Sequence, residues 1–107
     1  MRILLDESLP KALRTRLPGH EAATVVDCGW FGITTGKLLA LAAIRFDVFL
    51  TADQNIEYQQ NLATLPLAVF VPVVINNRIE SIAPLIPELL LKLNSHAPRS
   101  LQRIGTP

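Results

Sequence analysis

The sequence predicts an α/β fold: a three-layer α/β/α sandwich built on a mainly parallel sheet of four to five strands. Short apolar segments alternate with segments of helical periodicity, which is the element order of parallel sheets covered by helices. The apolar segments are continuous and do not alternate with polar residues, as expected for strands buried on both faces. With 107 residues, of which 50% are hydrophobic, the chain has the size of one domain with a substantial core.

The first half of the chain contains two predicted strands and two predicted helices. Residues 2–5 are short and apolar and end in Asp-Glu-Ser, which indicates a strand followed by a helix start. Residues 10–17 begin with a proline, which suits a first helical turn, and stop at Pro-Gly. Residues 22–26 form the second strand, and residues 35–45, rich in leucine and alanine, form the second helix.

The second half repeats this alternation. Residues 47–51 are apolar throughout and predict a third strand, and residues 54–62 predict a short helix. Residues 68–75 are rich in β-branched side chains and predict a fourth strand. Residues 79–94 predict a last helix that is bent or starts late, because two prolines interrupt its pattern. Residues 94–107 contain further prolines and a glycine and predict an irregular tail after the domain at 1–93.

The composition limits the classes of function. Ten basic and nine acidic residues give a net charge of +1, so the chain is not a strongly basic nucleic-acid binder, although a local basic stripe can lie beside an acidic pocket. The single cysteine, Cys28, allows no disulfide within the chain. Asp6 interrupts the N-terminal apolar run too early for a signal peptide, and no stretch approaches the ~20 apolar residues of a membrane span. We therefore expect a cytoplasmic protein.

Two aspartates follow predicted strands. Asp6 comes directly after the first strand and Asp53 shortly after the third. If these strands are parallel neighbours, roughly 4.8 Å apart, both carboxylates lie on one rim, where ligands of such sheets bind. Mg²⁺ or Mn²⁺ would relieve their repulsion and could support phosphodiester cleavage. Alternatively, each aspartate caps the helix that follows it.

Amides and cations accompany the two acids. Gln54 and Asn55 directly follow Asp53, and amides can bind a phosphate or nucleotide without adding negative charge. Lys11 and Arg14 lie on the polar side of the first helix, where they would either neutralise phosphates or form an ordinary solvated face. Arg78, after the fourth strand, is a further candidate phosphate contact.

An aromatic pair occupies the turn after the second strand. Trp30 and Phe31 stand between Gly29 and Gly32. Such rings either stack on a nucleic-acid base or cover the sheet or an interface.

Three segments carry a resemblance to a known family. "RILLDESLP" at the start, "LLALAA" before the third strand and "LTADQN" after it resemble the PIN-like family of small bacterial proteins over residues 1–93. That family is related to the PIN-domain ribonucleases, including VapC-type toxins. The resemblance implies an acidic cleft that holds Mg²⁺ or Mn²⁺ and cleaves RNA.

The resemblance also implies roles for individual residues. By position in that family, Asp6 and Asp53 would hold the metal. Glu7 and Glu57 match no expected acidic position of the family, but they lie near the two aspartates in sequence and could assist as further catalytic acids. Lys37 stands at or beside a position where relatives have Glu, and Asn55 where many have Asp.

These matches lead to a functional hypothesis with an alternative. The hypothesis is a Mg/Mn-dependent ribonuclease that acts as the toxin of a toxin–antitoxin pair. The alternative, favoured by Lys37 and Asn55, is a non-catalytic module that binds nucleic acid or protein with a degenerate acidic site, and Lys37 would then contact nucleic acid. A purely structural role, with both aspartates as caps, is the third reading. The apolar residues of 85–93 further suggest a homodimer or an antitoxin interface.

Overall fold

The computed structural model describes residues 1–76, 78–95 and 98–105. They form a five-stranded sheet in which every pair of neighbours is parallel, in the order β2-β1-β3-β4-β5. The strands are β1 (Arg2–Leu5), β2 (Glu21–Thr24), β3 (Val48–Leu50), β4 (Ala68–Pro72) and β5 (Leu101–Ile104). The α-helices are α1 (Thr35–Arg45), α2 (Ile56–Gln59), α3 (Ile79–Ile82) and α4 (Ile86–Leu93). Short 3₁₀ helices are η1 (Lys11–Thr15), η2 (Leu62–Thr64) and η3 (Ala83–Leu85).

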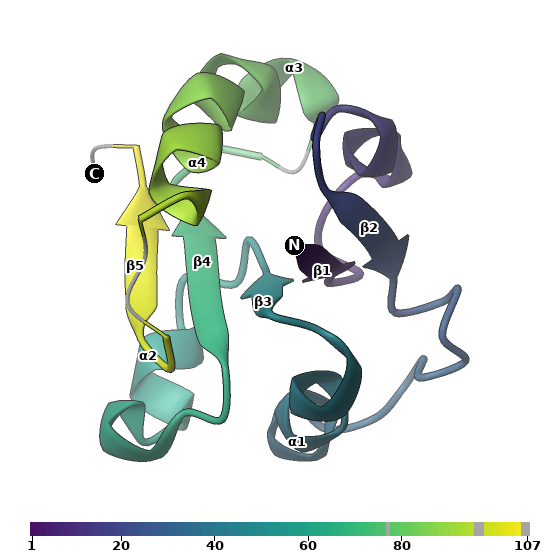
Figure 1. Cartoon of the computed structure of the whole chain (residues 1–107), viewed down its shortest axis with the longest axis vertical. Coiled ribbons are helices and arrows are strands. Elements are labelled where there is room, and N and C mark those ends of the chain that lie inside the picture. The colour runs from purple at the N-terminus through teal and green to yellow at the C-terminus, as the bar shows by residue number, and fades with distance from the viewer. Residues whose placement is uncertain (77, 96–97, 106–107) are drawn as a thin grey trace.

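The helices pack on both faces of the sheet and define two apolar cores. In β1, Ile3 and Leu5 belong to the core shared with η1, α3 and α4, whereas Leu4 belongs to the core shared with α1 and α2. Figure 1 shows α3 and α4 on one side of the strands and α1 on the other. Successive side chains of a strand point to opposite faces, so central strands buried on both faces must be apolar throughout. The predicted α/β class with a parallel sheet is confirmed, and the arrangement is compatible with an α/β sandwich.

Several predicted boundaries change. The helix predicted at 10–17 is the shorter 3₁₀ helix η1, and the helix predicted at 54–62 divides into α2 and η2. The strand predicted at 68–75 ends at Pro72, which has no N–H for the ladder. The last helix is interrupted as its prolines indicated, and it forms α3, η3 and α4 in succession.

The predicted irregular tail is wrong over residues 101–104. These residues form β5, which pairs with β4, so the sheet extends beyond residue 93. An edge strand accepts polar side chains because one of its flanks is open to solvent, and this makes its sequence look irregular. Residues 96, 97, 106 and 107 of the same segment lie outside the described residues.

Polar side chains cover both outer edges of the sheet. On β2, the Thr24 N–H donates to the Asp27 carboxylate at 3.0 Å, and Asp27 is in turn paired with Arg14. On β5, Lys92 Nζ donates to the Arg103 carbonyl at 3.5 Å. Just after the strand, the Gly105 N–H donates to Glu88 Oε2 at 2.9 Å. These contacts occupy backbone groups that would otherwise invite another strand.

None of the helices in the described part of the chain combines the length and the apolar character that a bilayer span needs. Helix α4 buries Leu89 and Leu93 against the sheet, and Leu91 is its large apolar side chain with a high exposed fraction, 71%. Most of the apolar side chains of α4 therefore pack inside the domain.

Candidate functional site

The candidate site lies at the carboxyl ends of β1 and β3. These strands pair in parallel with Leu5 opposite Leu50, so the next residues of the two strands, Asp6 and Thr51, emerge together. The Asp6 N–H continues the ladder by donating to the Leu50 carbonyl at 2.9 Å. The first and third strands are thus parallel neighbours, which is the condition on which the shared rim of the two aspartates depended.

Two hydroxyl groups join the two strand ends through one carboxylate oxygen. Asp6 Oδ2 accepts a hydrogen bond from Ser8 Oγ and one from Thr51 Oγ1, both at 2.8 Å. Each hydroxyl then accepts a backbone N–H from the loop after β3: Ser8 Oγ from Ala52 at 3.0 Å and Thr51 Oγ1 from Asp53 at 3.1 Å. Thr51 is only 1% exposed, whereas Asp6 and Ser8 are half-buried, so these bonds are partly shielded from water. Asp6 therefore organises the loop that carries Asp53.

The two aspartates use their side chains differently. Asp53 Oδ1 accepts the Asn55 N–H at 3.0 Å, just before α2 begins. This bond stabilises the turn before α2. It is not the helix cap that was the alternative to metal binding, because the N-cap residue of α2 is Asn55, whose side chain makes no capping bond. Asp6 instead directs Oδ2 to hydroxyl groups, and its Oδ1 makes no hydrogen bond within the described residues. Each aspartate thus retains one carboxylate oxygen without a protein partner in the described ranges.

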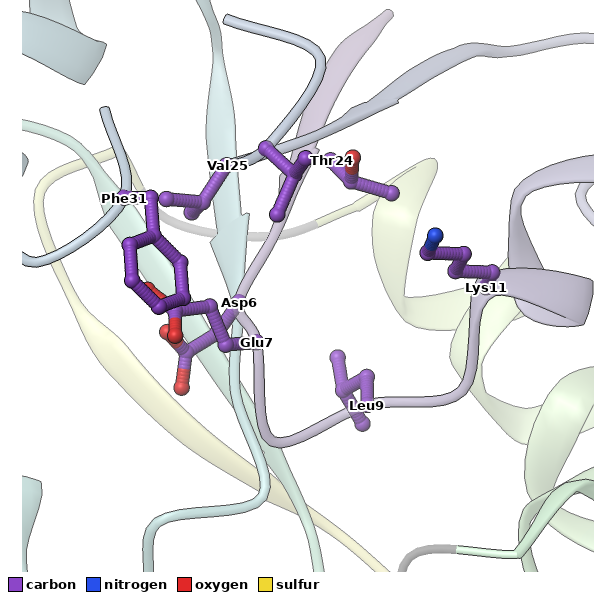
Figure 2. A pocket seen from close by; sticks show the side chains of 8 residues that line it. Asp6, Glu7, Leu9, Lys11, Thr24, Val25 and Phe31 are labelled. Atoms are coloured by element: carbon purple, nitrogen blue, oxygen red, sulfur yellow. The ribbon is translucent and has the colours of Figure 1, made fainter. Parts of the chain in front are cut away.

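A pocket of about 240 Å³ opens beside Asp6. Figure 2 shows Asp6 and Glu7 toward the end of the pocket where the Phe31 ring lies, and Lys11 toward the other end. Neither Glu7 nor Lys11 makes a hydrogen bond or ion pair within the described residues. The remaining lining is mostly apolar and consists of Leu9, Thr24, Val25 and Val26. Asp6, Glu7 and Lys11, three of the predicted site residues, therefore share one hollow.

Gln54 and Glu57 take part in a different set of contacts. Gln54 Nε2 donates to the Ala52 carbonyl at 3.3 Å and to the Pro72 carbonyl at 2.9 Å. Its Oε1 accepts from Arg103 of β5 at 3.1 Å, and Arg103 also forms an ion pair with Glu57. These contacts tie the Asp53 loop to the edge of the sheet. The two side chains are thus engaged in holding the loop.

The other predicted contacts are dispersed. Asn55 is exposed at the start of α2, and Lys37 is exposed in the first turn of α1. Arg78 precedes α3, where its N–H donates to Asn76 Oδ1 at 2.9 Å. Arg14 pairs with Asp27 at 2.8 Å. None of these four residues lines the pocket beside Asp6.

Two pKa shifts accompany the turn after β2. The Thr24 N–H and the Arg14 guanidinium hold the pKa of the Asp27 carboxyl below its usual range. Burial raises the pKa of the Cys28 thiol, so the thiol stays protonated at neutral pH. Cys28 therefore has the character of a packed side chain and not of a nucleophile.

Sequence reasoning missed the residues that connect the site. Ser8 and Thr51 link Asp6 to the loop after β3, and Arg103 links that loop to β5. A signal for Thr51 was present: it is the one polar residue between the apolar strand and the loop that carries Asp53. No comparable signal marked Arg103, because its strand was not predicted.

A metal centre of several protein ligands is not evident. Within residues 1–76, 78–95 and 98–105, no group of three or more His, Cys, Asp or Glu side chains is arranged to hold an ion. Comparison of the chain with family models, curated proteins and solved structures gives no match. The PIN-like resemblance therefore rests on the sequence motifs.

Proposed function

We propose that the protein is a Mg²⁺- or Mn²⁺-dependent ribonuclease of the PIN-like type and the toxin component of a toxin–antitoxin pair. The observation that supports this function is the hydroxyl-bridged rim. Asp6 and the loop of Asp53 come from neighbouring parallel strands and are held together by Ser8 and Thr51. The Asp6 carboxylate accepts two hydroxyl groups, and those hydroxyls in turn accept two backbone N–H groups of the loop that carries Asp53.

The donor set fits a metal that keeps most of its water. In this proposal the second oxygen of Asp6 and the Glu7 carboxylate would hold the ion in the pocket, and Asp53, which does not line the pocket, would contribute through a water. Carboxylate and water oxygens are the ligands that Mg²⁺ and Mn²⁺ prefer, and Mg²⁺ commonly needs only one or two protein carboxylates. A bound ion of this kind supplies a metal-activated water and stabilises charge on a phosphodiester.

The surrounding residues have supporting roles in the proposal. Lys11, at the far end of the pocket, offers a cation to a phosphate. Gln54 and Glu57, bound to Arg103, keep the loop of Asp53 in place, so their contribution is positional. An antitoxin, or a second copy of the chain, would use exposed apolar residues such as Leu91.

Metal binding and cleavage test this function together. Mn²⁺ should raise the thermal midpoint of the native chain and should not raise that of Asp6→Asn, because the substitution removes the negative charge that binds the ion. Glu80→Gln is the matched control, since Glu80 is an exposed acid outside the pocket, and it should respond to Mn²⁺ as the native chain does. Cleavage of a fluorogenic single-stranded RNA should follow the same pattern.

Expression in a bacterial host tests the toxin role. The native chain should arrest growth, and Asp6→Asn should not. A native chain that Mn²⁺ does not stabilise and that leaves RNA intact would eliminate the enzymatic proposal.

Two observations favour the second candidate function, a non-catalytic RNA-binding module. Asp53 commits Oδ1 to the Asn55 N–H, and the described residues contain no three-acid group. Such a module would bind single-stranded RNA without metal, and its affinity would fall steeply with salt because released counterions dominate binding. Metal-free RNA binding by both the native chain and Asp6→Asn, without cleavage, would select this candidate.

A further inference from the structure

We propose that Phe31 is a base-stacking residue of the site, which places one unpaired RNA base at the mouth of the pocket beside Asp6 and Glu7. This inference rests on the proposed function, because it needs an RNA substrate. It adds a specificity-determining contact that the metal-binding residues do not supply.

The turn after β2 separates its two aromatic side chains. Trp30 packs edge-on against Phe46, with ring centroids 6.2 Å apart, and Arg45 lies 5.5 Å from its ring. Phe31 makes no ring or cation–π contact within the described residues and is 71% exposed. The adjacent Trp30 therefore anchors the turn, whereas the Phe31 ring is available to a ligand.

The backbone of the turn holds this arrangement. Gly29 has φ +74° and Gly32 has φ +80°, a region that other residues rarely adopt. The Trp30 N–H donates to the Val25 carbonyl at 3.0 Å and the Gly29 N–H to the Val26 carbonyl at 3.0 Å. These backbone features fix the turn that carries Phe31, so the exposed ring is attached to an ordered backbone beside the pocket.

The pocket has the chemistry of a nucleotide site with one apolar and one charged part. Phe31, Val25 and Val26 offer an apolar wall, and Val26 is itself 50% exposed. Asp6 and Glu7 would hold the ion that binds a phosphate, and Lys11 adds a cation at the opposite end. A nucleotide would use all three features: its flat base would contact the apolar wall, and its phosphates would contact the ion and Lys11.

A basic peptide is the competing occupant. An arginine side chain would satisfy the two acids and could stack on Phe31. Lys11, which has no ion-pair partner among the described residues, would repel it. A nucleotide phosphate would instead be attracted to Lys11, so the pocket suits a nucleotide better than a basic peptide.

Binding of two probes tests the proposal. One probe is a short single-stranded oligonucleotide with 2′-O-methyl groups, which prevent cleavage, and the other is an abasic phosphodiester of equal length and charge. In the presence of Mn²⁺, the native chain should bind the base-containing probe about 5- to 150-fold more tightly, the range that stacking of one base provides. Phe31→Ala should abolish this preference and leave affinity for the abasic probe unchanged.

Three further variants separate stacking from other effects. Phe31→Trp should keep the preference, because it retains an aromatic face, and Phe31→Leu should lose most of it. Tyr58→Ala is the matched control: Tyr58 is also an exposed aromatic residue, at 79%, but does not line the pocket. It should behave as the native chain does. Both positions, 31 and 58, are on the surface, so the variants should fold.

Each contrary result has a distinct meaning. If Phe31→Ala or Phe31→Leu keeps the full native preference for the base-containing probe, stacking is refuted while the ribonuclease proposal stands. If the native chain binds neither probe yet Mn²⁺ stabilises it through Asp6, the base site falls and the metal site remains. If the native chain binds neither probe and Mn²⁺ does not stabilise it, both the base-stacking proposal and the metal-dependent ribonuclease proposal fall. An arginine peptide that binds through Phe31 when neither probe does would assign the pocket to protein recognition.

Discussion

Replacement of Thr51 by valine tests whether the hydroxyl bridge holds the site together. Valine has nearly the shape of threonine, so the substitution removes the hydroxyl without creating a cavity. It deletes the 2.8 Å bond to the Asp6 carboxylate and leaves the Asp53 N–H without its acceptor at 3.1 Å. A hydrogen bond to a charged group contributes about 1.5–3 kcal/mol to stability, and a buried backbone N–H left without an acceptor costs about 1–3 kcal/mol. Because the site is partly buried, we expect a loss in the lower part of the summed range, about 2.5–4 kcal/mol in total.

Urea unfolding followed by the fluorescence of the single tryptophan, Trp30, measures this loss. Thr64→Val is the matched control, because the Thr64 hydroxyl is exposed and donates only a long bond, 3.4 Å, to the Asn61 carbonyl. The control should change the free energy of unfolding by less than about 0.5 kcal/mol. A double-mutant cycle with Asp6→Asn should give a coupling of about 1 kcal/mol or more between positions 6 and 51. Additive losses, or a Thr51→Val chain as stable as the control, would refute the bridge.

Three further predictions concern the supports of the fold. Arg103→Met should lower the free energy of unfolding by about 1–2 kcal/mol, because it removes the ion pair with Glu57 and a hydrogen bond; an unchanged urea midpoint would contradict this. Gly32→Ala should lower the free energy of unfolding by about 1 kcal/mol, because alanine is strained at the positive φ of residue 32. Gly36→Ala, in the first turn of α1, should raise it by up to about 1 kcal/mol, because alanine favours helix. Equal effects of the two substitutions would contradict the turn geometry. The pKa of His20 lies below its usual 6.5 because burial and the N-terminal ammonium disfavour the charged ring. The unfolded chain therefore binds the proton first, so stability should fall as the pH drops below about 6.5, and His20→Gln should flatten that part of the pH profile of the urea midpoint.

Local patterns were sufficient to predict the central elements. The strands around Leu4, Phe49 and Val69 are apolar on both faces, and helix 35–45 has the same bounds in the sequence prediction and in the structure. Because parallel strands end at a common edge, the order of elements placed Asp6 and the loop of Asp53 on one rim. Whether they meet depended on the first and third strands being neighbours, which the sequence left open and the structure shows.

The outer parts depended on contacts between distant residues. The four residues of β5 have no strong strand pattern, and they form a strand because β4 offers an open edge. The choice of Gln54 and Glu57 as site residues was based on their nearness to Asp53 in sequence, yet Arg103, which binds both, lies more than forty positions away.

The sequence by itself determined the α/β class, the buried strands and the rim on which the two aspartates lie, because periodicity and burial act over a few neighbouring residues. The tertiary structure decided how each carboxylate is used: Asp6 accepts two hydroxyl groups and lines a pocket, whereas Asp53 stabilises a turn. It also decided that Trp30 is packed and Phe31 is exposed, although they are adjacent. Hydrogen bonds and ring contacts act over a few ångströms in space, and only the folded chain brings their partners within that distance.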